Sequence, residues 1–421
     1  MNKLEILNVV KDTNNNIFCL VGPNTTGKTF TLNFIYEELN SRTLLITEEG
    51  LFKTKNKRNK IKLINDTYYY QDESNRGNKE RREDEFEVMN QETKNIISKL
   101  QKLRFELNSK YLSLGSKKIL NILDILLGIN LNNIDYILID EPENSLDDVN
   151  LKKVKEVIEI LKLNGKKVFF VTHSSRLMEL LSLNIDDIYF ISKIMGNVYN
   201  IKFKEIETLY DECANEIRNV KCFSNITFID KISCDAPEKF KDLYLNTLLK
   251  SEEFYRILFY RKIYLLEGLT EKYILRNNPK LIDLANNVYF LNGKNIAFFF
   301  IKILLKLDKE IVCIIDDDDK KEKNKRGFSY YYSIFLKKSF KNEKNVEIFL
   351  IPYDLETYLN INIHDILEEI FNTTISGNQE NAIIKRYKPY GALYAIKENK
   401  CEKNKLNDLF YDNKIYIQKE N

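Results

Sequence analysis

Residues 17–29 read IFCLVGPNTTGKT. The five apolar residues at the start predict a buried strand, and the FTLNFIYEEL that follows has helical periodicity. Between them, Gly22 to Thr29 matches the GxxxxGK[ST] pattern in the strand, loop and helix context that it requires. Glycines let backbone N–H groups surround phosphate oxygens, and the helix N-terminus adds a positive dipole. The stretch therefore predicts a phosphate-binding loop within an α/β domain.

The same loop supplies the groups that would bind a nucleotide and its magnesium ion. We expect Gly22, Asn24 and Gly27 to lie along the phosphates. Lys28 would reach the β- and γ-phosphates, and the Thr29 hydroxyl would bind Mg²⁺. The first half of the chain is therefore predicted to use a nucleoside triphosphate with Mg²⁺.

Two further predicted strands carry polar groups suited to nucleotide hydrolysis. Residues 136–147 read YILIDEPENSLD, so Asp140 and Glu141 end a buried strand. Asp140 is placed to bind Mg²⁺ through water, and Glu141 to polarise the attacking water. Residues 167–173 read KVFFVTH, and His173 at the end of that strand could contact the γ-phosphate.

A resemblance to ABC-type ATPases follows from these motifs and their order. In YLSLGSKKIL at 111–120, LSLGS resembles the LSGGQ signature, SLDD from Ser145 resembles the D-loop, and VTHS resembles the H-loop. The resemblance implies an ATP-binding ABC-type ATPase domain over residues 1–205. It also implies that Ser113 and Gly115 contact the γ-phosphate bound by an opposite subunit, so we expect a homodimer or a higher homo-oligomer.

Two stretches around this domain have a different character. Residues 52–109 form a charged insertion, which we expect to be a flexible loop followed by a helix, because apolar residues recur at helical spacing over 96–107. A solvated charged face is the first interpretation of this run, and a DNA-facing lobe is the second. Residues 206–260 are mostly amphipathic and predict a helical connector.

An unusual acidic run lies further along the chain. Residues 311–326 read IVCIIDDDDKKEKNKR, and neighbouring carboxylates repel one another unless water or a cation screens them. A solvated acidic turn is one interpretation, and a bound divalent cation is the other. Asp316 follows the apolar run and Asp318 lies two positions on, so both can point the same way from an extended strand tip. Ligation by Asp317 and Asp319 is the alternative register.

Two other predicted strands also lead into carboxylates. Residues 263–275 read IYLLEGLTEKYIL, with Glu267 at the strand end, and residues 348–359 read IFLIPYDLETYL, with Glu356 near the end. Parallel strands bring their carboxyl ends to one edge of a sheet. Mg²⁺ prefers such oxygen ligands. Two ions about 4 Å apart would clamp the attacking and leaving oxygens of a phosphodiester.

The order of acids Glu…DxD…(D)xE resembles the TOPRIM domain of topoisomerases, primases and certain nucleases. An ABC-type domain followed by TOPRIM resembles the OLD (overcoming lysogenisation defect) family. The resemblance implies a TOPRIM domain with a C-terminal extension over 261–421, binding Mg²⁺ or Mn²⁺. Lys388, in KRYKPYGALYAI, resembles a catalytic lysine of that family, and Glu267 would act with it. The implied metal ligands or their supports are Glu267, Glu271, Asp316, Asp318 and Glu356.

OLD proteins are ATPase-coupled nucleases, among them the large subunit of Gabija anti-phage systems. The resemblance therefore implies an ATP-regulated, metal-dependent endonuclease acting in defence against phage or plasmid, with DNA as the first substrate and a partner protein of the defence system as an option. The YDLETYL stretch also resembles TOPRIM-like effectors of PARIS-type systems, which attack tRNA. A third reading is a RecF-like, DNA-binding ATPase whose TOPRIM domain has no catalytic role.

Composition limits these readings only loosely. The chain has 421 residues, and 65 basic and 62 acidic residues give a net charge of +3, so a strongly basic nucleic-acid protein is excluded. With 43% hydrophobic residues, two or three globular domains are expected. The six cysteines form no CxxC pair, and no apolar run approaches the roughly 20 residues that span a bilayer. We expect a cytoplasmic protein without membrane contact.

Overall fold

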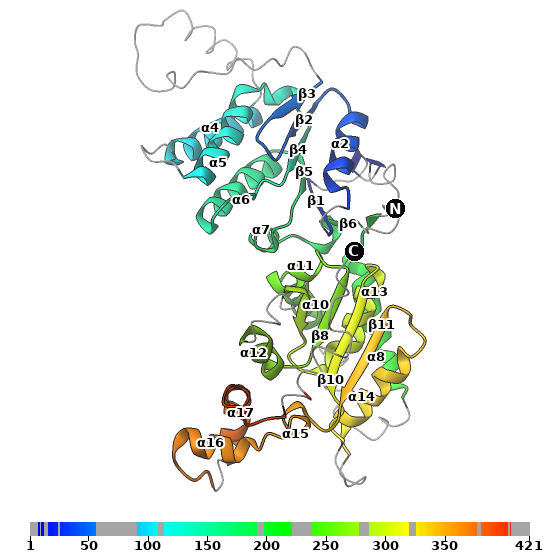
Figure 1. The fold of residues 1–421 in the computed structure, drawn as a ribbon. Coiled ribbons are helices and arrows are strands. Elements are labelled where there is room, and N and C mark those ends of the chain that lie inside the picture. Colours follow the sequence, from blue (N-terminus) through cyan, green and yellow to red (C-terminus); the bar gives the residue numbers. More distant parts are fainter. Residues whose placement is uncertain are drawn as a thin grey trace, which may run out of the picture. The chain divides into compact units, whose positions relative to one another are not determined.

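The computed structural model describes residues 7–8, 10–11, 16–23, 26–55, 91–107, 113–191, 198–220, 238–277, 286–319, 326–376, 380–402 and 405 (Figure 1). The chain folds into two compact units. The first comprises Met1–Phe203 with Asn246–Phe259, and the second comprises Lys204–Leu245 with Tyr260–Asn421.

The first unit is built on a seven-stranded sheet of order β3-β2-β4-β5-β1-β6-β7. The pairings that join β2, β4, β5, β1 and β6 are parallel, and the two outer pairings are antiparallel. The central strands are apolar on both faces, as expected where helices cover both sides. The strands are β1 (Ile17–Val21), β2 (Thr43–Ile46), β3 (Phe52–Thr54), β4 (Tyr136–Asp140), β5 (Lys167–Val171), β6 (Ile188–Ile191) and β7 (Val198–Tyr199).

Helices cover both faces of this sheet. Helix α2 (Lys28–Glu38) lies on one face, and α4 (Gln91–Leu107), α5 (Leu114–Gly128) and α6 (Asp148–Leu163) lie on the other (Figure 1). Leu32 and Ile35 of α2 pack with Phe18 and Leu138 of the strands in one buried cluster. Helix α4 includes the helix expected over 96–107. Short helices complete the unit: η2 (Leu131–Asn133), α7 (Ser175–Leu180), η3 (Ile185–Asp187) and α11 (Glu252–Ile257).

The segment Asn246–Phe259 belongs to the first unit although it follows part of the second in sequence. Its helix α11 packs on α7, and the buried Tyr255 hydroxyl donates a 2.7 Å hydrogen bond to the carbonyl of Leu183. The predicted connector, 206–260, is helical where it is described. Its helices are α8 (Phe203–Arg218), α10 (Glu238–Leu249) and α11, and α10 crosses the boundary between the units.

The second unit contains a four-stranded sheet of order β11-β10-β8-β9 in which every pairing is parallel. The carboxyl ends of all four strands therefore meet at one edge. The strands are β8 (Lys262–Leu266), β9 (Val288–Phe290), β10 (Glu310–Asp316) and β11 (Val346–Ile351).

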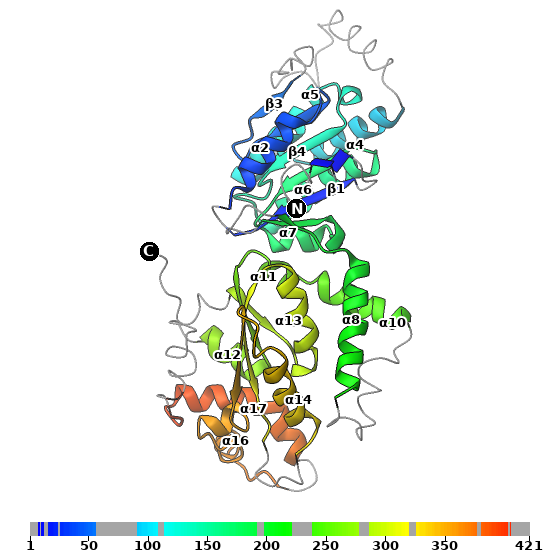
Figure 2. The same cartoon turned by 90° about the vertical axis from the view of Figure 1, so that its right-hand side faces the viewer.

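The helices of the second unit lie on two sides of this sheet (Figure 2). Alternate strand residues, among them Tyr264, Leu266, Val312 and Ile314, form one apolar cluster with α12, α15, α16 and α17. Asp316 continues this alternation at the strand end. The helices are α12 (Leu269–Asn277), η6 (Lys294–Ile296), α13 (Ala297–Lys306), α14 (Phe328–Ser339), α15 (Leu355–Tyr358), α16 (Ile363–Phe371) and α17 (Glu380–Lys397). Within the described ranges, no helix is long and apolar enough to cross a bilayer.

Candidate functional site

The glycine-rich loop connects β1 to α2. A side chain at Gly22 would place its Cβ 2.7 Å from the backbone oxygen of Ile191, so glycine is required there. Gly27, with φ 83°, occupies the left-handed region immediately before α2. The Lys28 ammonium turns back and donates to the carbonyl oxygens of Gly22 (3.0 Å) and Pro23 (2.9 Å). The ammonium thus lies within the loop that was predicted to bind phosphates, while Asn24 is outside the described residues.

The two residues predicted to bind the magnesium ion of the nucleotide, Thr29 and Asp140, lie close together. The Thr29 hydroxyl is 3.4 Å from Oδ1 of Asp140, the buried last residue of β4. Burial raises the pKa of Asp140, and the hydrogen bond from Thr29 partly opposes that rise. Burial also lowers the pKa of Lys28 to about 8, against the pull of Glu141 and Asp140.

Glu141 and His173 are in direct contact. Glu141 has φ 44°, in the left-handed region that non-glycine residues rarely adopt, and its Oε1 lies 3.0 Å from Nε2 of His173. Burial and the charge of Lys28 lower the pKa of His173 to about 4, so at neutral pH the imidazole beside Glu141 is uncharged and the contact is not an ion pair. Burial, then Glu48 and Glu143, raise the pKa of Glu141. The predicted base and the predicted phosphate-sensing histidine therefore form one pair.

Glu143 is a site residue that the motifs did not identify. Its carboxylate accepts 2.6 Å hydrogen bonds from the Thr172 hydroxyl and the backbone N–H of His173. Burial raises its pKa, and its Oε2 has no hydrogen-bond partner among the described residues. Glu143 therefore fixes the position of His173 relative to the end of β4. No motif distinguishes Glu143, because the EPEN stretch contains two acids that look equivalent.

The predicted signature residues form a separate cluster at the start of α5. The Ser113 side chain caps this helix by accepting a 3.1 Å hydrogen bond from the Ser116 N–H. A Cβ on Gly115 would lie 2.9 Å from Nδ2 of Asn150 and 3.1 Å from Leu146, so α5 begins directly against the predicted D-loop. The neighbouring Leu114 is 74% exposed. Ser113 is likewise exposed, whereas Gly115 is buried against the predicted D-loop.

Carboxylates also gather at the carboxyl edge of the second sheet. Glu267 follows β8, and its Oε2 accepts a 3.0 Å hydrogen bond from the backbone N–H of Asp316 at the end of β10. Burial raises the pKa of Asp316 to about 9, and the charges of Glu267 and Glu271 add to the rise. Oδ1 of Asp316 is buried and has no hydrogen-bond partner in the part of the chain that is described.

Helices α12, α15 and α17 each bring one further predicted residue to this edge. Burial, opposed by a backbone hydrogen bond and reinforced by Glu267, raises the pKa of Glu271 on α12 to about 7. Glu356 on α15 is buried and lies 2.7 Å from the ammonium of Lys388 on α17, which also lies 3.1 Å from Asp354. Burial would lower the pKa of Lys388, but these two carboxylates raise it above its ordinary value.

Asp318 is paired with two residues that do not belong to this group, although its charge still helps to raise the pKa of Glu267. Strand β10 ends at Asp316, and Asp318 has φ 53°, so the extended geometry that would align the two side chains does not continue. Its carboxylate accepts a 2.5 Å hydrogen bond from the Ser329 hydroxyl and forms an ion pair with the ammonium of Lys294. Lys294 is 2% exposed and was not predicted.

The alternative register, Asp317 and Asp319, is engaged by other parts of the chain. Oδ1 of Asp317 accepts hydrogen bonds from the backbone N–H groups of Tyr353 (2.7 Å) and Asp319 (2.8 Å). The Asp319 carboxylate accepts two bonds, at 2.6 and 2.8 Å, from the Arg326 guanidinium. Both carboxylates therefore stabilise the turn after β10.

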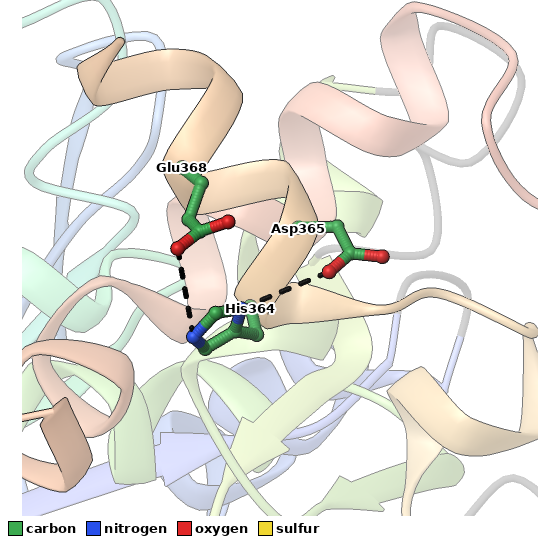
Figure 3. Close-up of side chains that lie close together, drawn as sticks. All are labelled: His364, Asp365 and Glu368. Atoms are coloured by element: carbon green, nitrogen blue, oxygen red, sulfur yellow. Dashed lines mark ion pairs between the residues drawn. The ribbon is translucent and has the colours of Figure 1, made fainter. Parts of the chain in front are cut away.

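A different cluster has its ligand atoms closest together. His364, Asp365 and Glu368 on α16 have one ligand atom each within 4.8 Å of the others (Figure 3), and across the described ranges no second set of three His, Cys, Asp or Glu side chains does so. The atoms are already used by the chain, because Nε2 of His364 lies 2.9 Å from the Ile375 carbonyl and Glu368 accepts from the Ile375 N–H. The cluster therefore holds α16 to the segment after it.

Comparison with known proteins bears on the first unit. Residues 36–179 match a family described as "AAA domain, putative AbiEii toxin, Type IV TA system". The matched region begins after the phosphate-binding loop and includes Asp140, Glu141 and His173. The match covers less than half of the chain; it is consistent with a P-loop ATPase domain in the first unit and with the predicted ABC-type domain. No curated protein matches the chain.

Proposed function

We propose that this protein is an ATP-regulated, divalent-metal-dependent nuclease that acts in defence against foreign nucleic acid. The observation that carries the proposal is the carboxylate of Asp316. It lies close enough to Glu267, Glu271 and Glu356 for their charges to raise its pKa, and its buried Oδ1 has no hydrogen-bond partner among the described residues. Acids gathered in this way destabilise a fold unless a proton or a cation neutralises them. A cation at this edge is the simplest reason for the arrangement.

The residues at this edge fit Mg²⁺ or Mn²⁺. Both are hard ions that prefer carboxylate oxygens and water, and the unpartnered Oδ1 of Asp316 is such a donor. Glu267 and Asp316 would hold the ion, with Glu271 and Glu356 as supports. A bound ion supplies charge stabilisation at a phosphoryl oxygen. The Lys388 ammonium would add a fixed positive charge for the scissile phosphate.

The arrangement of the second sheet supports the resemblance to TOPRIM domains and the OLD family. A parallel sheet with acids at its carboxyl edge is where α/β proteins bind ligands. In the first unit, Lys28, Thr29 and Asp140 would bind ATP with Mg²⁺, and Glu141 would activate water. Ser113 and Gly115 would complete the site of a second copy, so the working form would be a homodimer or a higher assembly.

The defence role and the substrate are supported less directly. The family matched by the first unit bears the name of a toxin and of toxin–antitoxin systems, which fits a defence function. DNA is the first substrate to test, and tRNA is the second. The pairing of Asp318 with Lys294 favours a competing function, a RecF-like ATPase that binds DNA without cutting it, because one predicted ligand is neutralised.

The test compares cleavage of supercoiled plasmid, linear DNA and tRNA, with and without ATP, in Mg²⁺ and in Mn²⁺. We expect Asp316→Asn to lose cleavage by at least about 100-fold while keeping ATP hydrolysis. Asp365→Asn is the matched control, because it removes an exposed carboxylate of the α16 cluster, and it should cleave like the wild type. Cleavage retained in Asp316→Asn excludes this site, and tight DNA binding without cleavage in any metal supports the competing function.

A further inference from the structure

Lys294 is a buried lysine at the acidic edge. It follows Gly293, whose φ of 115° requires glycine, and the Gly293 N–H donates a 3.0 Å hydrogen bond to the Glu267 carbonyl. The Lys294 ammonium donates a 2.7 Å hydrogen bond to the backbone carbonyl of Asp316 and forms an ion pair with Asp318. Main-chain contacts at the ends of β8 and β10 therefore fix this positive charge in place.

We infer that Lys294 is an internal cation that holds Asp318 out of the metal site, so that a divalent ion recruits Asp318 only by drawing it away from the lysine. This inference rests on the proposed function, because it assumes that Glu267 and Asp316 bind the ion. Lys294 is then a positioning residue, which acts through Asp318 and not on the substrate.

The two aspartates show why the lysine has this effect. Oδ1 of Asp316 is buried and has no hydrogen-bond partner among the described residues, whereas Asp318 is paired with both Lys294 and Ser329. The Asp318 side chain is 39% exposed, so water can solvate its carboxylate when it leaves the lysine. The Lys294 side chain is 2% exposed and keeps its hydrogen bond to the Asp316 carbonyl. The exchange therefore leaves the buried ammonium with a carbonyl acceptor but without its carboxylate, and this cost opposes recruitment of Asp318.

While Lys294 is paired with Asp318, two effects weaken metal binding at the acidic edge: the positive charge of the lysine and the loss of one carboxylate ligand. The Lys294 ammonium repels a divalent cation that approaches Glu267 and Asp316. It also removes Asp318 from the available ligands, and affinity for such ions increases with the number of charged ligands. Neutralising Lys294 should therefore strengthen metal binding, whereas a purely structural lysine would leave the affinity unchanged or reduce it.

The test measures Mn²⁺ affinity of the full chain without nucleotide, from the electron paramagnetic resonance signal of free Mn²⁺. Asp316→Asn defines which binding belongs to the acidic edge. Lys294→Gln is neutral yet keeps a donor for the Asp316 carbonyl, and we expect about tenfold tighter binding, equal to about 1.4 kcal/mol. Ser329→Ala is the matched control, because it removes the other partner of Asp318 without changing charge, and its affinity should stay within about twofold of wild type.

A double variant tests the role of Asp318 itself. In Lys294→Gln/Asp318→Asn the part of the gain that comes from the recruited ligand should disappear, and only the smaller part that comes from the lost repulsion should remain. If circular dichroism shows that Lys294→Gln is misfolded, Lys294→Met replaces it as the neutral variant. Unchanged or weaker Mn²⁺ binding in the folded neutral variants, or a gain that persists undiminished in the double variant, overturns the role of Lys294 and leaves the metal site standing. No Asp316-dependent Mn²⁺ binding in any protein overturns the metal site as well.

Discussion

Asp316 and Asp318 are two positions apart and experience opposite electrostatic surroundings. The position of Asp316 follows from the sequence, because an apolar run predicts where β10 ends. The direction of Asp318 does not follow, since it depends on a left-handed φ and on Lys294, which lies between two apolar stretches without any motif. A long-range ion pair of this kind leaves no local pattern. Local patterns thus locate strand ends, and side-chain directions beyond them depend on tertiary contacts.

The two histidines of the chain give a prediction on pH, because their pKa values shift in opposite directions. The pKa of His173 is lowered to about 4, so between about pH 4 and its ordinary pKa the unfolded chain binds a proton that the folded chain does not. Its contribution to stability is therefore lost as pH falls from about 6.5 towards 4, by on the order of 2 kcal/mol. His173→Asn should lose less stability than wild type between pH 7 and pH 5 in urea denaturation.

His364 provides the opposite control. The Ile375 carbonyl, then nearby carboxylates, raise its pKa, so its stabilising effect is present at low pH and is lost as pH rises through that value. His364→Asn should therefore make the loss of stability on acidification larger than in wild type. Equal pH dependence of wild type and both variants would contradict these assignments.

At the scale of elements, strands and motifs predicted contacts between distant parts of the chain. The loop at 22–29 and the strand at 136–140 were expected to share an ion, and Thr29 and Asp140 are within 3.4 Å. This works because parallel strands place their carboxyl ends at one edge. The return of α11 to the first unit could not be predicted in the same way. It depends on the contact of Tyr255 with Leu183, and amphipathic helices look alike before their partners are known.

Two serine helix caps allow the effect of the predicted signature on ATP hydrolysis to be distinguished from its effect on stability. Ser113 caps α5 and Ser251 caps α11, each by accepting a hydrogen bond from a backbone N–H three residues on. Ser113→Ala and Ser251→Ala should each lower the free energy of unfolding by about 1 kcal/mol. Only Ser113→Ala should also reduce ATP hydrolysis, by about tenfold or more, because its hydroxyl would serve the phosphate bound by a second copy. The measurements are urea denaturation and steady-state phosphate release.

The concentration dependence of hydrolysis completes this experiment. If Ser113 acts on a second copy, ATP turnover per chain should rise with protein concentration in wild type and in Ser251→Ala. Equal loss of hydrolysis in both variants would show that the cap matters only for folding, and the shared site would then be excluded.

At the scale of the whole molecule, the chain joins an ATPase domain to a unit whose acids are gathered at one sheet edge. The net charge of +3 says nothing of a polymer substrate, since acidic and basic residues nearly cancel. The sequence predicted two chemistries, one for each half, from separate motifs. No sequence motif predicts the coupling between the two sites. It depends on how ATP binding at one site changes the populations of conformational states at the other.

Lys28 gives the direct test of that coupling. Its ammonium lies among the carbonyl oxygens of the loop and would move to the phosphates of ATP. Lys28→Ala should lose ATP hydrolysis by at least about 100-fold. If ATP controls cleavage, the ratio of wild-type cleavage rates with and without ATP differs from one, and in Lys28→Ala it returns to one. Lys152→Ala, which removes an exposed lysine of α6, should behave as wild type in both assays. Identical cleavage by Lys28→Ala and wild type at every ATP concentration would mean that the two activities are independent. A ligand that binds two conformational states equally well does not shift the equilibrium between them, so ATP would then have no effect on the nuclease site.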